Sequence, residues 1–198
     1  EDAVLIGRYG IRTWGHWLGE LLPKLVAVEA AFPKRFKYIL PGAVVTDRVL
    51  RTLRESLALY GIAEDRFLLV DPETSYRFTK LRVVSPIWSV EKAIHPRAVE
   101  LMRSIIPSEQ ELHSAPEQIA LLRRETKTRR LENLEQISAF LNDRGWPIVD
   151  VGFLSFRDQV RLFGKAKRIV AILGSGLSGL IYSSPGVEVL TLAPSTWS

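Results

Sequence analysis

The chain has 198 residues, of which 46% are hydrophobic and 25% charged, and these ordinary values exclude a disordered or fibrous protein. It contains no cysteine and three histidines, which excludes disulfides and a cysteine nucleophile and disfavours a metal site. The net charge of +5 suits an anionic partner such as a nucleotide, an acidic polymer or a membrane surface. Nucleic acid is disfavoured, because the basic residues are scattered and no recognition motif is present.

Short apolar runs alternate with amphipathic segments along the first half, which is typical of an α/β protein with a mostly parallel sheet. Residues 14–31 are predicted to form a helix, since large apolar residues recur there at helical spacing, and Pro23 should kink it. The other expected elements are a strand at 38–40, a helix at 47–60 and strands at 67–70 and 81–84.

Four prolines mark the segment 85–116, which we interpret as a crossover around one helix at 97–105. The second half then repeats the strand–helix alternation of a Rossmann-like unit. A helix at 132–144 should face inward through Ile137, Phe140 and Leu141. The remaining expected elements are strands at 119–122, 148–151, 169–173 and 187–192, a helix capped by Ser155 that ends at Gly164, and a short helix after a glycine-rich loop.

The expected fold is therefore α/β, with two Rossmann-like halves built on mostly parallel sheets. Residues 1–94 would form the first half, 95–116 the linker and 117–198 the second half. The longest apolar runs have strand length, so no membrane span is expected. Because the sequence begins with Glu1 rather than Met and stops in a Ser/Thr-rich stretch, we expect a fragment. Since 198 residues are short for two full Rossmann-like domains, we expect an abbreviated or incomplete first half.

The first motif that could form part of a functional site is the glycine-rich loop after the predicted strand at 169–173. Backbone N–H groups of Gly174, Ser175 and Gly176, and the hydroxyl of Ser178, could bind phosphate where the next helix begins. The spacing matches neither the dinucleotide fingerprint nor a P-loop. A tight strand-to-helix turn would explain the same residues.

A second candidate is the basic run that follows the predicted strand at 119–122. Arg123 lies at the end of that strand, and Arg129 and Asn133 lie where the next helix starts. Ligands of open α/β sheets bind at the carboxyl ends of strands, and arginine grips phosphate with paired hydrogen bonds. The run could equally be a solvated loop balanced by nearby glutamates.

The third candidate is a histidine–carboxylate pair on the first predicted helix. His16 and Glu20 are four positions apart and therefore share a face. A carboxylate can orient an imidazole for proton transfer from a hydroxyl group, and Trp14 and Trp17 could stack on a sugar ring. The alternative is an ordinary polar stripe, continued by Lys24, with both tryptophans in the core.

In their order along the chain, these stretches resemble glycosyltransferase family 61 from Trp14 to Ala193. His16 to Leu25 is similar to the family's opening helix, and Arg123 to Asn133 to its arginine-rich segment. Ser155 to Ala166, followed by the glycine loop and Pro185-Gly186, is similar to its C-terminal signature.

The resemblance implies a GT-B-like pair of halves with an active site between them, and an inverting sugar transfer from a nucleotide sugar without an obligatory metal. His16 would be the base, with Glu20 orienting it or acting as the base itself. The resemblance also adds Gln159 to the donor contacts. The expected co-substrate is UDP-linked, and no separate cofactor is expected. The acceptor would be a glycan or lipid-linked glycan of a bacterial capsule or surface polysaccharide, modified in the cytoplasm at the inner membrane face.

The glycine loop departs from the family pattern at two positions. Leu173 replaces a histidine and Gly179 replaces an asparagine. Loss of these polar groups indicates a different nucleotide sugar. It also leaves a second hypothesis open, in which the chain is a catalytically inactive module that binds a nucleotide or glycan within a polysaccharide assembly protein.

Overall fold

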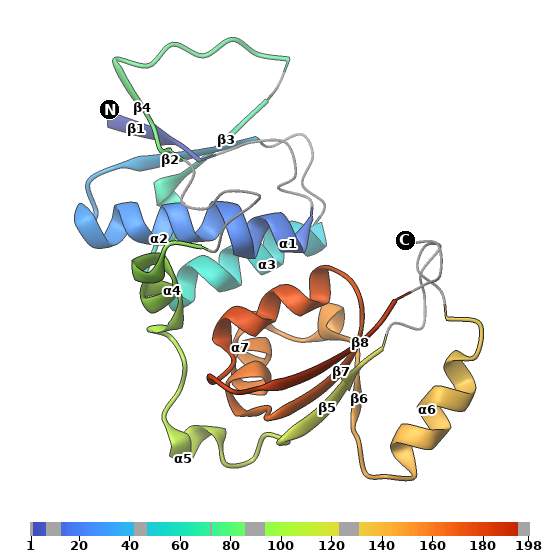
Figure 1. Ribbon diagram of the computed structural model, residues 1–198. Helices are drawn as coiled ribbons and strands as arrows, with labels where there is room; N and C mark the ends of the chain where they lie inside the picture. Colours follow the sequence, from blue (N-terminus) through green and yellow to red (C-terminus); the bar gives the residue numbers. More distant parts are fainter. Residues whose placement is uncertain are drawn as a thin grey trace. The chain divides into compact units, whose positions relative to one another are not determined.

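The computed structural model describes residues 2–6, 13–41, 47–71, 73–85, 94–122 and 131–193 (Figure 1). The chain divides into two compact units, Glu1–Ile105 and Ile106–Ser198, called unit 1 and unit 2. The division falls within 95–116, the segment expected to be the linker. Helix α4 (Pro96–Arg103) belongs to unit 1, and the short helix α5 (Glu109–Leu112) belongs to unit 2.

Unit 1 is built on a four-stranded parallel sheet in the order β3-β2-β1-β4. The parallel sheet confirms what the alternating pattern predicted, and its strand order is the 3-2-1-4 order of a Rossmann half. The expected strands at 38–40, 67–70 and 81–84 are confirmed, whereas β1 was not predicted, although residues 3–6 are all apolar. The strands are β1 (Asp2–Leu5), β2 (Lys37–Pro41), β3 (Phe67–Val70) and β4 (Lys80–Val83).

The helices α2 and α3 of unit 1 lie on the same side of its sheet (Figure 1). The predicted helix at 14–31 is confirmed, but it consists of α1 (Trp14–His16), a π-helical turn η1 (Trp17–Leu21) and α2 (Leu22–Ala31). Pro23 lacks an N–H group and its ring would crowd the carbonyl of Gly19 in a regular helix. The wider π turn, in which the Leu22 N–H bonds to the Trp17 carbonyl, relieves that crowding.

Two further elements complete the described part of unit 1. Helix α3 (Asp47–Leu59) confirms the prediction for 47–60 and leads through a 3-10 turn, η2 (Glu64–Arg66), into β3. Helix α4, expected at 97–105, packs against α2. Its amino end is capped by His95, whose Nδ1 accepts the Arg97 N–H.

Unit 2 contains a second parallel sheet in the order β6-β5-β7-β8. In chain order this is 2-1-3-4, the doubly wound arrangement, so the expectation of two halves with parallel sheets is confirmed. The strand expected at 148–151 ends at Val149, because Asp150 accepts the Gly152 N–H and starts the 3-10 turn η3 (Val151–Phe153). The strands are β5 (Gln118–Leu121), β6 (Ile148–Val149), β7 (Arg168–Ile172) and β8 (Glu188–Leu192).

Helices α6 (Leu134–Asn142) and α7 (Phe156–Lys165) lie on opposite sides of the unit 2 sheet (Figure 1). Leu141 is buried against the sheet and Ile137 packs beside it. The expectation that Phe140 faces inward was wrong. Its side chain is 52% exposed and the Arg144 guanidinium lies 3.6 Å from its ring centre, because position 140 falls outside the stripe that residues 137 and 141 share.

Ser155 caps α7 as predicted, since its hydroxyl accepts the Asp158 N–H. The helix buries Phe156, Val160 and Phe163, also as predicted. The short helix expected after the glycine-rich loop is a 3-10 helix, η4 (Ser175–Tyr182). No helix in the described part of the chain has both the length and the apolar character that crossing a membrane requires.

Candidate functional site

The His16–Glu20 pair predicted from the sequence is present in unit 1. The Glu20 carboxylate accepts a hydrogen bond from Nδ1 of His16. The Glu20 side chain is only 5% exposed, whereas that of His16 is 45% exposed. In the neutral ring with Nδ1 as the donor, Nε2 of the imidazole carries the lone pair. A group from solution can therefore reach His16, while Glu20 is placed to hold the ring.

The backbone that carries this pair is anchored in the core. Trp17 is 1% exposed, and its Nε1 donates to the buried Ser56 hydroxyl of α3 at 3.0 Å. Trp17 is thus a core residue, which excludes its use as a platform for a sugar ring. The pair straddles the start of the π turn, and such turns occur frequently at functional sites.

The position of His16 in the sheet topology also favours a ligand site. The chain turns one way from β1 to β2 and β3, while β4 pairs with the other side of β1. The segment that leaves the carboxyl end of β1 and leads to α1 therefore starts at the topological switch point. Ligands of open parallel sheets bind at such points.

Unit 2 has its own switch point, between β5 and β7. Leu121 pairs with Ala171 in register, so the chain leaves these two neighbouring strands at the same edge. The glycine-rich loop follows β7 there, and the Leu177 N–H bonds to the Gly174 carbonyl to open η4. Ser175, Gly176 and Ser178 lie in the first turns of this 3-10 helix and are partly exposed. The loop thus occupies the edge at which a phosphate site was predicted.

The two departures in the glycine loop have different surroundings. A Cβ at Gly179 would lie 2.0 Å from the ring of Phe163, so α7 packs directly against the backbone of this glycine. Packing of α7 against η4 therefore requires a glycine at position 179 in this structure. Leu173 is partly buried, and its N–H bonds to the Leu192 carbonyl of β8.

The other predicted site residues are distributed as follows. Arg123 and Arg129 lie outside the described residues, although Leu122, which precedes Arg123, lies at the carboxyl edge of β5. Asn133 is exposed at the amino end of α6 and makes no side-chain capping bond. Gln159 is 6% exposed on α7, where its amide donates to the Leu154 carbonyl at 3.3 Å.

The sequence reasoning did not single out Phe153, which lies on η3. Its side chain is 76% exposed, and a Cβ at Gly176 would lie 3.4 Å from the neighbouring Val151. Val151 therefore lies against the glycine loop, and the exposed Phe153 follows it by two residues on the same turn. The position of Phe153 two residues after the strand predicted at 148–151 was the only available signal, because exposure of a phenylalanine cannot be read from the chain alone.

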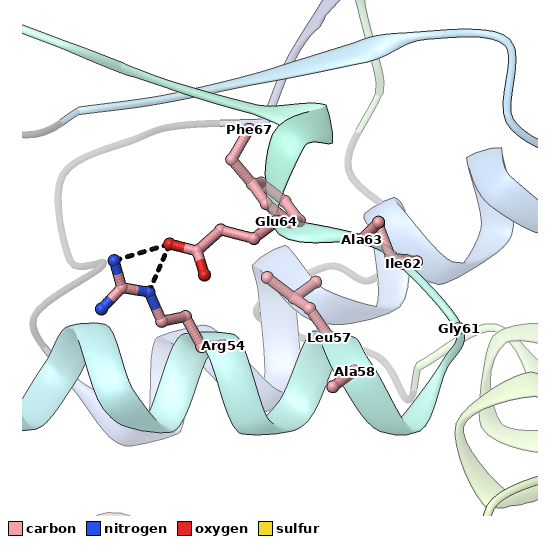
Figure 2. A pocket seen from close by; sticks show the side chains of 8 residues that line it. All are labelled: Arg54, Leu57, Ala58, Gly61, Ile62, Ala63, Glu64 and Phe67. Atoms are coloured by element: carbon pink, nitrogen blue, oxygen red, sulfur yellow. Dashed lines mark hydrogen bonds and ion pairs between the residues drawn. The ribbon is translucent and has the colours of Figure 1, made fainter.

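Two hollows in the described residues lie away from these carboxyl edges. In unit 1, a hollow of about 380 Å³ lies beside the first residue of β3, and the Arg54–Glu64 ion pair, 2.6 Å long, crosses it (Figure 2). Its lining is otherwise apolar. In unit 2, a groove of about 730 Å³ lies at the amino ends of β7 and β8. Neither is where the predicted site residues lie. No cluster of three or more potential metal ligands occurs within the described ranges.

Residues 14–190 match the sequence profile of the Glycosyltransferase 61 family, and the chain belongs to that family. Among solved structures, it is similar to the iron-containing dodecameric glycosyltransferase TibC of enterotoxigenic E. coli H10407, with 14% identity and a TM-score of 0.42. A structure of the heptosyltransferase TibC with ADP-D-β-D-heptose gives 15% identity and a TM-score of 0.42. Each match covers 98% of this chain and 58% of TibC, so the chain spans less than two thirds of that protein. No curated protein matches the chain.

Proposed function

We propose that this chain carries the catalytic core of an inverting glycosyltransferase that moves a sugar from a nucleotide sugar to a glycan acceptor. The half-exposed imidazole of His16, held by the buried carboxylate of Glu20, is the observation that carries the proposal. Family membership supplies the class of reaction. The acceptor we propose is a growing capsule or surface polysaccharide at the cytoplasmic face of a bacterial membrane.

His16 would act as the general base in this reaction. Its Nε2 takes the proton of an acceptor hydroxyl while the oxygen attacks the anomeric carbon from the face opposite the nucleotide. The bond between that carbon and the diphosphate oxygen breaks, and the nucleoside diphosphate leaves. Glu20 stabilises the imidazolium that forms and keeps the ring in the tautomer with a free Nε2.

The donor would bind at the carboxyl edge of the unit 2 sheet. Arg123 and Arg129 would neutralise the departing diphosphate, and the N–H groups that open η4 would donate to it. Asn133 begins the helix after the arginines and is available for a polar contact with the nucleotide. Gln159 would act indirectly, because its amide donates a hydrogen bond to the Leu154 carbonyl. This bond holds the backbone just before the amino end of α7.

An inactive nucleotide- or glycan-binding module is the second candidate. Leu173 favours it, because this position offers no polar side chain to a donor. The substitution at Gly179 does not, since packing against Phe163 explains it. The two candidates differ in one measurable respect, which is turnover of a bound nucleotide sugar.

The first experiment is a thermal-shift screen with UDP, GDP, CMP, ADP and their common sugars, including ADP-heptose. A ligand at about 100 times its dissociation constant should stabilise the fold by roughly 2.7 kcal/mol. Arg123→Ala and Arg129→Ala should abolish the shift. Arg168→Ala is the matched control, since this arginine lies at the opposite, amino edge of the same sheet, where it bonds to Gln118.

Release of the nucleoside diphosphate is then measured with candidate glycan acceptors. Acceptor-dependent release that requires His16 supports the transferase. Tight binding without release, with every acceptor tried, favours the inactive module. If the folded protein binds no nucleotide at millimolar concentration, the assignment of the donor site is wrong.

A further inference from the structure

The turn between α2 and β2 combines exposed aromatic and basic residues in the sequence Phe-Pro-Lys-Arg-Phe-Lys at 32–37. Helix α2 ends at Ala31, and Lys34 adopts a left-handed conformation with φ of 58°. The Lys34 N–H donates to the Glu29 carboxylate at 2.7 Å. This bond holds the turn in one conformation, so its side chains have defined positions.

Phe36 anchors the turn, and Phe32 is presented at its surface. Phe36 is 3% exposed, its carbonyl accepts Nε of Arg66 at 2.7 Å, and the Arg82 guanidinium lies 4.7 Å from its ring centre. The Phe32 ring meets Phe36 edge-on at 5.6 Å but is 47% exposed. The Arg35 guanidinium lies within 5.8 Å of both ring centres. An apolar ring is thus held outward among cations.

Further basic residues gather at the same edge of the sheet. Lys37 starts β2 and Lys80 starts β4, and both strands pair in parallel with the amino end of β1. Figure 1 shows the carboxyl end of α2 and the amino end of β1 at the same side of unit 1. We call this surface the amino-edge patch and define it as Phe32, Lys34, Arg35, Lys37 and Lys80.

The charge of the patch is not balanced locally. Within the described residues, its four basic side chains form no ion pair, since the Lys37 ammonium donates to the uncharged Asp65 carbonyl. The nearby carboxylates Asp2 and Glu29 are already paired, with Arg82 and Arg66 respectively. Among the described residues here, Glu64 is paired with Arg54, which leaves Asp65 against the four basic side chains and gives the described part of this edge a positive excess.

We propose that the amino-edge patch docks the protein on the surface of an anionic lipid bilayer. Basic side chains are attracted to anionic headgroups, and an exposed aromatic ring inserts at the boundary between headgroups and acyl chains. Both features occur here on one rigid turn. Because the patch lies at the amino edge of the sheet, docking leaves free the carboxyl edge from which the chain leads to His16. The inference needs neither the donor site nor the catalytic assignment.

The test is co-sedimentation of the protein with vesicles, without nucleotide sugar or acceptor. Vesicles of phosphatidylcholine alone are compared with vesicles that also contain phosphatidylglycerol. We expect binding only to the anionic vesicles, and weaker binding at high salt because charges are screened. Lys34→Asn, which tolerates the left-handed backbone, and Arg35→Gln should each weaken partitioning by about fivefold. Phe32→Ser should weaken it at every salt concentration.

The matched control is the double variant Phe140→Ser, Arg144→Gln in unit 2, which removes another exposed phenylalanine with an arginine over its ring. It should bind vesicles like the original protein. Equal binding to neutral and anionic vesicles would overturn the proposal, as would a control that loses as much binding as the patch variants. The proposal would also be overturned if the protein bound no vesicles but bound a soluble acidic polysaccharide through the patch. The patch would then be a binding site for a polyanion. Circular dichroism and melting temperatures establish that each variant is folded.

Discussion

The ring of Phe163 fills the space that a side chain at Gly179 would occupy, because a Cβ there would lie 2.0 Å from Cε2 of the ring. Helix α7 can approach η4 this closely only over a glycine. In this arrangement, a larger side chain at position 179 and the phenylalanine ring at 163 therefore exclude each other without a shift of one element.

Gly179→Asn should consequently destabilise the protein by about 3 kcal/mol or more, as overpacking of a tight core does. Denaturant unfolding measures this loss. In a Phe163→Ala background, the same substitution should cost clearly less, because the ring is gone. Equal costs in the two backgrounds would mean that the ring does not set the requirement for glycine. Gly61→Asn is the matched control, since a Cβ at Gly61 meets nothing within 4 Å and asparagine tolerates its positive φ.

His16→Gln should lower the turnover number by about 10²- to 10⁴-fold with little change in nucleotide affinity, because the base acts in the chemical step. Glu20→Gln should cause a smaller loss, since glutamine can still accept the Nδ1 proton but lacks the charge that stabilises imidazolium. Steady-state kinetics with a fixed acceptor separates the two effects. Lys24→Gln, on the same helical stripe, should leave the rate unchanged. A fully active His16→Gln variant would exclude this histidine as the base.

Phe153→Ala should weaken nucleotide binding by about tenfold, the loss expected when a base no longer stacks on an aromatic ring. Titration calorimetry with the nucleotide found in the screen measures the dissociation constant. Phe140→Ala provides the comparison, because it removes another exposed phenylalanine from the same unit. If both variants bind as tightly as the original protein, Phe153 has no part in the donor site.

The Glu29 carboxylate links α2 to the unit 1 sheet and should make stability depend on pH. Burial favours its neutral form, but hydrogen bonds from the Tyr38 hydroxyl, the Lys34 N–H and the Arg66 guanidinium outweigh this and lower the pKa of Glu29 below its usual value. For a lowered pKa, the stabilisation is present above the pKa of the unfolded chain and is lost as pH falls through that of the folded protein.

Glu29→Gln should therefore cost about 2 kcal/mol of unfolding free energy at neutral pH, the range for hydrogen bonds to a charged group. The difference from the original protein should shrink as pH falls below about 4. Urea unfolding across this pH range provides the measurement. Glu100→Gln, which breaks the exposed pair with Arg97, should change stability by less than about 1 kcal/mol at any pH. If Glu29→Gln lowered the free energy of unfolding by the same amount at every pH, the stabilisation would not come from the charge of the Glu29 carboxylate.

The sequence alone determined the α/β class, the parallel sheets and most helices and strands, because these depend on local apolar periodicity and on caps such as Ser155. It also paired His16 with Glu20, since four positions along a helix bring two side chains to one face. The strand β1 was missed although its residues are apolar, and Phe140 was placed inward because a one-residue offset on a helix cannot be resolved from spacing alone.

Only the tertiary structure decided which residue of the His16–Glu20 pair is exposed to solvent. It also decided which residues, such as Gly179, are required for packing. Burial of Glu20 and exposure of His16 depend on how the π turn seats Trp17 against Ser56, a contact 39 positions away in the chain. The reason for Gly179 lies in the ring of Phe163, on another helix. The amino-edge patch likewise forms because parallel strands bring their first residues to one edge, so Lys37 and Lys80 meet there despite their separation in sequence. Such relationships arise from packing between distant segments, which local pattern does not encode.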